Sequence, residues 1–110
     1  MNQPCKWTAN ASDVRILRDL FKRKREIAEN PVTLARKSLW ARHHSLDSRR
    51  PMILAETSGV LDECAPLSSL RCQEDWARGM ERGLRDLIFR YEHVRDDYVV
   101  EPWINIAWDI

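Results

Sequence analysis

The sequence predicts an α/β protein, in which a helical N-terminal arm precedes the opening βαβ unit of a larger α/β fold. Apolar residues recur at helical spacing over residues 14–28, 32–43 and 76–91. Two apolar stretches rich in β-branched and aromatic residues, 51–57 and 98–108, lie on either side of the third helical segment. A strand, a helix and a strand in this order form a parallel, right-handed βαβ unit.

The arm spans residues 1–50 and is predicted to hold two helices. The first begins near Ser12 or Asp13, because both side chains can accept a hydrogen bond from a free N–H group of the first turn. Lys24 lies in line with the apolar side of this helix, so we expect its stem to follow the apolar surface while the ammonium group reaches water. The second helix begins at Asn30-Pro31, a capping residue followed by a proline suited to the first turn. Its inner side is predicted to carry Val32, Ala35, Leu39, Trp40 and His43.

The second region, residues 51–110, is predicted to be a truncated first βαβ region, which the family resemblance described below places in a barrel. Residues 51–57 form its first strand, and residues 60–73 form a loop with one helical turn, because Pro66 prevents a longer helix. A four-turn helix follows, with Glu74 and Asp75 at its start, where the helix dipole favours negative charge. Gly79 and Gly83 share one face of that helix, which predicts close backbone packing there.

The closing stretch is predicted to be a strand that is covered on both faces. Ile104, Ile106 and Trp108 point one way and Trp103 and Ala107 the other, so both faces are largely apolar. Two parallel strands cannot hide such faces by themselves. The pattern therefore predicts that the chain is the leading part of a larger protein, with the missing remainder of a barrel or a second subunit as its partner.

Composition excludes several classes of protein. The 44% hydrophobic and 32% charged content is that of a globular chain, and no apolar run reaches the length of a membrane span. Residues 1–50 carry a net charge of +7 and residues 51–110 one of −6, so the chain as a whole lacks the basic balance of a nucleic-acid binder. An odd number of cysteines, 3, and a start without the layout of a signal peptide predict a reduced, cytoplasmic protein.

Few residues are candidates for chemistry. Glu101 and Asn105 are polar groups in an apolar stretch, and at the end of a barrel strand they would face the substrate, so they are the candidate substrate-binding residues. Asp96 and Asp97 are predicted to lie in a solvated turn. His43 and His44 diverge on a helix and cannot readily share one metal ion. The cysteine spacing matches no zinc motif, so we predict no metal site in this chain. The sequence does not identify the catalytic residues, which stay unknown at this point.

Two stretches carry a family resemblance: "EIAENPVTLARKSLWARHHSLDSRRPMIL" and "LRCQEDWARGMERGLRDLIFRYEHVRDDYVVEP". Together with the spacing between them they resemble the N-terminal portion of uroporphyrinogen decarboxylase-like proteins, from a bacterial branch of that superfamily. The resemblance covers roughly residues 14–106. It implies a (β/α)8 barrel enzyme of which this chain is the leading part.

The resemblance also implies a choice of reactions. Members of the superfamily are lyases that decarboxylate tetrapyrrole acetate groups without a cofactor, or methyltransferases that act on corrinoid proteins or thiols with a zinc-bound thiolate. "SRRP" at residues 48–51 does not match the arginine-glycine motif of true uroporphyrinogen decarboxylases. The zinc ligands of the methyltransferases would lie beyond these residues, so zinc or corrinoid would belong to the parent enzyme and no cofactor to this chain. By itself the segment is expected to be inactive.

A second interpretation places the chain in another class. In this interpretation it is a complete small interaction protein of the cytoplasm, which forms a homodimer through its apolar C-terminal stretch.

Overall fold

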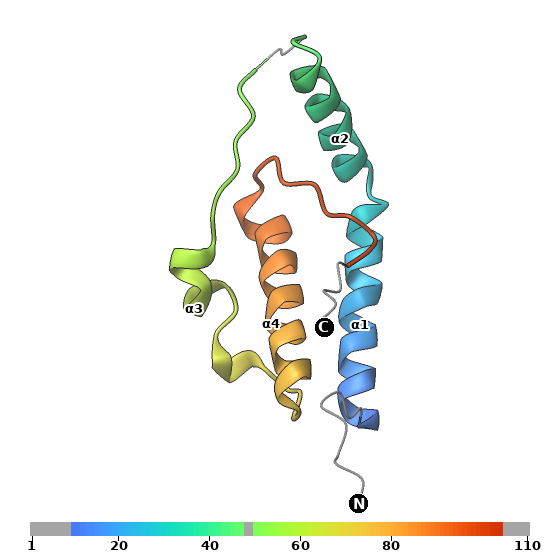
Figure 1. Ribbon diagram of the computed structural model, residues 1–110, viewed down its shortest axis with the longest axis vertical. Helices are drawn as coiled ribbons and strands as arrows, with labels where there is room; N and C mark the ends of the chain where they lie inside the picture. The colour runs from blue at the N-terminus through green and yellow to red at the C-terminus, as the bar shows by residue number, and fades with distance from the viewer. Residues whose placement is uncertain (1–9, 48–49, 105–110) are drawn as a thin grey trace, which may run out of the picture.

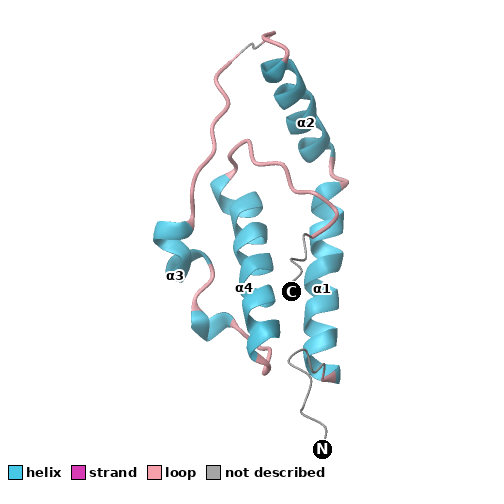
Figure 2. Ribbon diagram, in the orientation of Figure 1, coloured by secondary structure: helices cyan, strands magenta, loops and turns pink. Residues whose placement is uncertain are grey.

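The computed structural model describes residues 10–47 and 50–104, and throughout these residues the secondary structure is helical, without a strand (Figure 1, Figure 2). The elements, in chain order, are α1 (Ala11–Ala28), α2 (Pro31–His44), the 3₁₀ turn η1 (Ser58–Val60), α3 (Leu61–Cys64), the 3₁₀ turn η2 (Leu67–Ser69), α4 (Asp75–Phe89) and the π-helical turn η3 (Arg90–Val94).

The predicted α/β fold is therefore wrong, and with it the βαβ unit and the TIM barrel. Residues 51–57 and the described part of the closing stretch, 98–104, contain no strand. They do approach each other, since the Asp97 N–H donates to the Ile53 carbonyl at 2.8 Å. The reciprocal backbone bond is missing because the Ile53 N–H donates to the Asp97 carboxylate (2.7 Å), while the Asp97 carbonyl accepts from the Trp40 indole (2.6 Å). The Asp97 carboxylate and the Trp40 indole thus occupy the backbone groups that would otherwise bond to each other in a β-ladder.

Helices α1 and α4 form the body of the molecule. They lie side by side and run in the same direction, and α2 continues beyond the end of α1 (Figure 1). The first hydrophobic cluster between them contains the buried residues Leu17, Cys72, Ala77 and Leu84. The second contains Ile27, Ala28 and Val100. The closing segment therefore contributes to the core as a coil that enters between the two helices.

Helix α1 begins slightly earlier than predicted. Asn10 is its N-cap, and its side chain accepts from the Asp13 N–H at 2.8 Å. Asp13 itself is fully buried, and its two carboxylate oxygens accept from the N–H groups of Gln73 (2.8 Å) and Glu74 (2.9 Å). A residue expected to cap its own helix thus caps the start of α4, and it joins the two helices.

Lys24 follows the prediction only in part. It lies among the apolar residues of α1 and is buried, but its ammonium group donates to the Trp103 carbonyl at 2.6 Å instead of reaching water. Burial lowers the pKa of Lys24, although the nearby Glu101 carboxylate acts in the opposite direction. This hydrogen bond ties the closing segment to α1.

The start of α2 confirms its prediction. Asn30 caps the helix by accepting from the Val32 N–H at 2.9 Å, and Pro31 occupies its first position. The predicted inner side is wrong at Val32, Ala35 and His43, which are exposed, because α2 extends past α1 and only Thr33 of its residues is buried. Helix α2 therefore presents most of its surface to solvent.

Helix α4 begins at Asp75 with Glu74 as its N-cap, as predicted. The expected close packing at Gly79 and Gly83 is wrong, since a Cβ atom on either residue would meet no heavy atom within 4 Å. Glu81 on this helix is fully buried, and it accepts from the N–H groups of Arg71 and Cys72, both at 2.9 Å. The loop before α4 is thus held by a carboxylate, and the single helical turn predicted within it is α3.

We predict that Asp13→Ala lowers the free energy of unfolding by about 2 kcal/mol, because two N–H groups at the start of α4 lose their acceptor. Asp19→Ala is the matched control, since Asp19 lies on the same helix and is exposed; it should change stability by less than about 0.5 kcal/mol. Urea unfolding followed by circular dichroism measures both. Equal losses for the two variants would contradict this role of Asp13.

Candidate functional site

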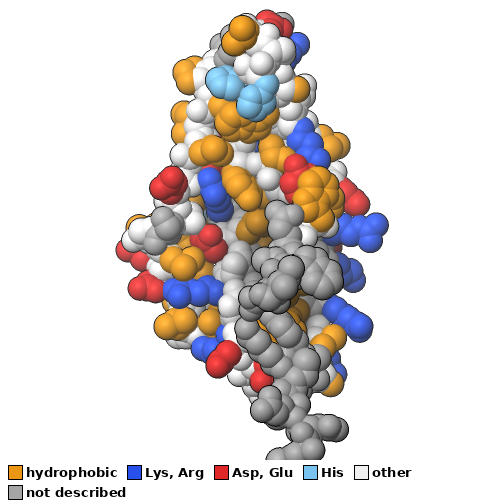
Figure 3. All heavy atoms as spheres, in the orientation of Figure 1, with side chains coloured by type: hydrophobic (Ala, Val, Ile, Leu, Met, Phe, Trp, Pro, Cys, Tyr) orange, Lys and Arg blue, Asp and Glu red, His pale blue; other side chains and the backbone are white. Residues whose placement is uncertain are grey.

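A shallow cavity of about 320 Å³ lies where α2, the segment 50–57 and the closing segment meet. Its lining is mostly apolar, and Leu54 within it is 53% exposed. Figure 3 shows hydrophobic side chains beside the two histidines at the α2 end of this face. The residues that line the cavity are Lys37, Trp40, Leu54, Tyr98, Val99 and Glu101.

Glu101 is the predicted site residue that the structure places at this cavity. Its Oε2 atom lies 3.2 Å from the Lys37 ammonium nitrogen, in an ion pair without hydrogen-bond geometry. Both side chains are about two-fifths exposed, at 41% for Lys37 and 37% for Glu101. The pair therefore forms a polar rim beside an apolar floor. Asn105, the other predicted residue, lies outside the described residues.

Asp97 holds the three parts of the cavity wall together. Its carboxylate accepts two hydrogen bonds from the Arg50 guanidinium, at 2.8 and 2.9 Å, and one from the Ile53 N–H. Its carbonyl accepts from Trp40 of α2. The hydrogen bonds from Arg50 lower the pKa of Asp97 to about 2 against the opposing effect of burial. Charge-assisted, bidentate contacts of this kind fix both distance and direction.

Asp96 links α4 and its π-helical turn to the segment 50–57 in a similar way. Its carboxylate accepts from the Arg90 guanidinium at 2.7 Å and from the Ala55 N–H at 2.8 Å. Burial alone would raise the pKa of Asp96, but the hydrogen bonds from Arg90 and Ala55 keep it below its usual value. Arg90 also lies over the Tyr98 ring, 4.2 Å from its centroid. The solvated turn predicted for these two aspartates is wrong, because Asp96 is 9% and Asp97 8% exposed.

Sequence reasoning missed Asp97, Arg50 and Trp40 as the residues that shape this region. One signal was present: two adjacent carboxylates directly before an apolar stretch are placed where a buried segment begins. The sequence does not show which N–H groups such carboxylates meet, because Ile53 and Ala55 lie more than forty residues away along the chain.

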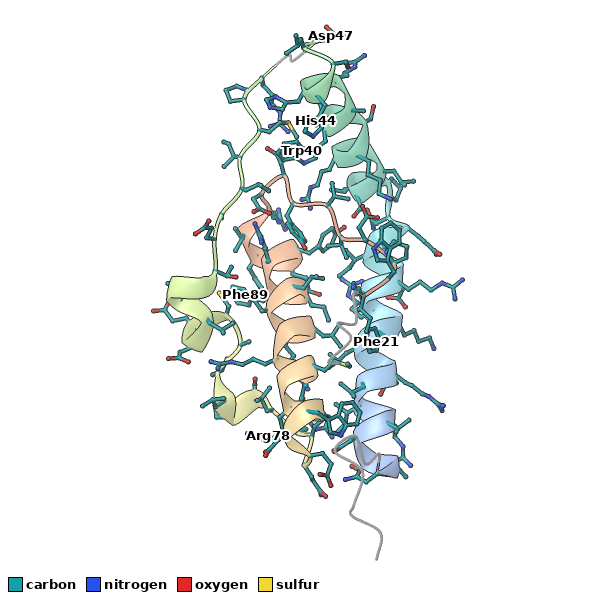
Figure 4. The ribbon with its side chains drawn as sticks, in the orientation of Figure 1. Phe21, Trp40, His44, Asp47, Arg78 and Phe89 are labelled. Carbon is teal, nitrogen blue, oxygen red and sulfur yellow. The ribbon has the colours of Figure 1, made fainter. Side chains whose placement is uncertain are left out.

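His43 and His44 do not line the cavity themselves, but both contact the Trp40 ring, which does. His44 stacks on Trp40 with ring centroids 5.8 Å apart, on the side of α2 that faces the segment 50–57 (Figure 4). His43 meets the same ring edge-on at 5.6 Å. Burial and the neighbouring Glu81 carboxylate raise the pKa of the Cys72 thiol to about 11, so this thiol is protonated at neutral pH.

No group of three or more His, Cys, Asp or Glu side chains in the described residues is arranged to hold a metal ion. The donor set needed for a zinc site is therefore not assembled by residues 10–47 and 50–104. In the same residues, no helix has both the length and the hydropathy of a membrane span.

Comparison with known proteins adds no assignment: no protein-family model, curated protein or solved structure matches the chain. The site must therefore be interpreted from its own geometry. A shallow apolar floor with an ion pair at its rim is suited to receive an apolar side chain of another protein.

We predict that the free energy of unfolding falls as the pH is lowered from about 4 to about 2. The contribution of Asp97 is complete above its ordinary pKa of 3.8 and is lost as the pH falls through its folded value of about 2. Asp97→Asn should be less stable than the wild type at pH 6, and this difference should vanish near pH 2. Urea titrations at several pH values measure it.

Asp47→Asn is the matched control, because Asp47 is exposed. It should leave the pH dependence of stability unchanged. A wild-type and an Asp97→Asn profile that run parallel from pH 6 to pH 2 would rule out the depressed pKa.

Proposed function

We propose that this chain is a docking module: the leading portion of a uroporphyrinogen decarboxylase-like enzyme, which packs against the rest of that enzyme through the cavity of Leu54, Val99 and Glu101. The whole enzyme would carry out methyl transfer involving a corrinoid or a thiol, or decarboxylation of a tetrapyrrole-type substrate. Zinc or corrinoid would be held by the rest of the enzyme. We place the protein in the cytoplasm, in keeping with its odd number of cysteines.

The observation that carries this proposal is a set of exposed apolar side chains in the described residues. Ile53, the neighbour of Leu54 in the cavity lining, is 63% exposed, and Trp103, two residues beyond Glu101, is 58% exposed. Large exposed apolar side chains that lie near one another are typical of protein contact surfaces. Aromatic residues are also enriched there, because they bury a large area for few lost rotamers. The resemblance over residues 14–106 supports the proposal that the partner is the rest of a uroporphyrinogen decarboxylase-like enzyme.

In this proposal Glu101 acts in docking. Its ion pair with Lys37 lies at the rim, where charged groups give specificity and orientation more than affinity. Leu54 and Val99 supply the floor on which an apolar side chain of the partner body would rest.

We predict that the chain binds, as a separate polypeptide, to the product of the same reading frame downstream of codon 110. Val99→Glu should weaken this binding at least tenfold, because it places a charge on the apolar floor. Leu67→Glu is the matched control, since Leu67 is 58% exposed and lies on η2, outside the cavity lining. Co-purification and isothermal titration calorimetry measure the effect.

Two outcomes would contradict the docking role. One is a reading frame that stops at codon 110. The other is a downstream polypeptide that does not bind the wild-type chain, or that binds wild type and Val99→Glu equally well.

The second candidate function is that of a small interaction protein, which assembles with a second copy through the apolar residues of its closing segment. The exposure of Trp103, at 58%, and of Ile104, at 37%, favours it. We predict that Trp103→Ser converts a dimer of the wild-type chain to a monomer in size-exclusion chromatography with light scattering. Leu67→Ser is the control and should remain dimeric. A wild-type chain that is monomeric, or a Trp103→Ser variant that remains dimeric, would exclude this contact.

A further inference from the structure

The segment 51–56 is drawn out without a turn (Figure 1), and one of its two edges is hydrogen-bonded to the rest of the molecule. The N–H groups of Ile53 and Ala55 both donate to carboxylates, those of Asp97 and Asp96. The Ile53 carbonyl accepts from the Asp97 N–H. In an extended chain, alternate residues direct their N–H and C=O groups to the same edge. The odd-numbered residues of this segment therefore face inward.

The even-numbered residues direct their backbone to the other edge, and that edge is open. Within the described residues, the backbone N–H and C=O groups of Met52, Leu54 and Glu56 make no hydrogen bond. Pro51, which has no N–H group, is odd-numbered and removes no donor from the open edge. The segment is thus a one-sided strand that forms no ladder of its own.

Natural proteins protect such edges, because an open edge pairs readily with another extended chain. Lysine, proline or a bulge at the outward positions is the usual protection. Here the even-numbered positions are methionine, leucine and glutamate, and the apolar side chains Ile53 and Leu54 are more than half exposed, at 63% and 53%. The edge is therefore suited to pair.

We propose that this edge binds a second copy of the chain, by antiparallel pairing of the segment 50–56 across a two-fold axis at Ile53. Met52 then lies opposite Leu54 of the other copy, and both residues have free backbone groups with which to form a hydrogen-bonded pair. Ile53 lies opposite Ile53 of the second copy in a non-hydrogen-bonded pair. This suits a residue whose backbone groups are already bonded to Asp97 of the same chain. An isologous contact of this kind closes at two subunits.

Charge complementarity selects this register and the second copy as occupant. Pairing about Ile53 places Arg50 opposite Glu56 of the other copy, twice in each dimer. Opposite charges directly across an antiparallel pair are stabilising. Glu56 is exposed and makes no ion pair within the described residues, and the Arg50 guanidinium keeps its positive charge while it donates to Asp97 and to the Pro51 carbonyl. Pairing about Leu54 would instead place Met52 opposite Glu56 and leave this carboxylate without a facing cation.

This contact does not rest on the proposed docking function. It uses the backbone edge of residues 50–56, whereas docking uses the apolar floor at Val99. It is also an alternative to the dimer contact at Trp103, since Trp103→Ser should leave a dimer formed by the edge intact. Because Val99→Glu leaves the edge intact and the edge variants leave Val99 intact, the two proposals can fail separately.

The test is register-specific cross-linking of the full chain in which Cys5 and Cys64 are replaced by serine. In the proposed register, Ile53→Cys places two thiols in a non-hydrogen-bonded pair with Cα atoms about 4.5 Å apart, a distance that a disulfide can span. In a glutathione redox buffer we expect Ile53→Cys to form a covalent dimer. Leu54→Cys is the matched control and should remain monomeric on a non-reducing gel.

A second variant tests the charge pairing without a new thiol. Glu56→Arg should weaken self-association by about tenfold in analytical ultracentrifugation, because each dimer loses two attractive pairs and gains two repulsive ones. Glu63→Arg makes the same change of charge at an exposed position of α3 and should have no effect.

Three results would overturn the proposal. The first is a wild-type chain that is monomeric at about 100 µM. The second is cross-linking of Leu54→Cys that equals or exceeds that of Ile53→Cys. The third is pairing of the segment 50–56 that is observed only after the downstream polypeptide is added. In that case the edge would bind a strand of that polypeptide and not a second copy of the chain.

Discussion

The structure depends on buried carboxylates that accept hydrogen bonds from backbone N–H groups of segments without regular secondary structure. Asp13 and Glu81 hold the loop before α4, and Asp96 and Asp97 hold the segment 53–55. A buried carboxylate is stable only when its charge is matched, and two or more N–H or guanidinium donors supply that match here. Because only eight hydrophobic residues in the described part of the chain are buried, the loops cannot be held by apolar packing alone. The carboxylates give each loop a fixed position on the helices.

The same interaction explains why an apolar, β-branched segment forms no sheet. Ile53 and Asp97 approach as two strand residues would, with one backbone hydrogen bond between them. The second bond of the pair is made by a side-chain oxygen instead of the carbonyl that a ladder would use. The same replacement of a backbone acceptor by a carboxylate occurs at Ala55, whose N–H donates to Asp96. The two segments are therefore held together, but not in the register of a β-ladder. The result is a drawn-out segment with one satisfied edge, placed against the cavity of α2.

The positions of the helices could be predicted from the sequence, but the contacts that hold the loops could not. The signals for α2 and α4 are local: a capping residue, a proline, and apolar residues at a spacing of three and four along the same segment. The role of Asp13 is not local, because the N–H groups that it caps lie sixty residues away. Strand propensity failed for a related reason, since it measures how well a side chain fits a pleated, half-buried surface and not whether a partner strand is present. Of the two candidate site residues, Glu101 lies at the cavity, where its lone carboxylate is paired with Lys37. The ion pair between Lys37 of α2 and Glu101 of the closing segment could not be predicted from the residues next to Glu101 in the sequence.

Leu54 connects the two surfaces of this molecule. In an extended chain the side chain lies perpendicular to the edge along which the backbone bonds, so its side chain lines the cavity while its N–H and C=O groups lie on the open edge. Its backbone neighbours are fixed by Asp96 and Asp97, but its own backbone is held by no hydrogen bond within the described residues. A strand that paired with the edge would remove this freedom and hold the floor of the cavity in one position. An apolar side chain that entered the cavity would in turn restrict the backbone at the edge. If both proposed contacts form, binding at either surface would therefore reduce the conformational entropy that binding at the other must overcome, and the two contacts would favour each other without any rearrangement of the helices.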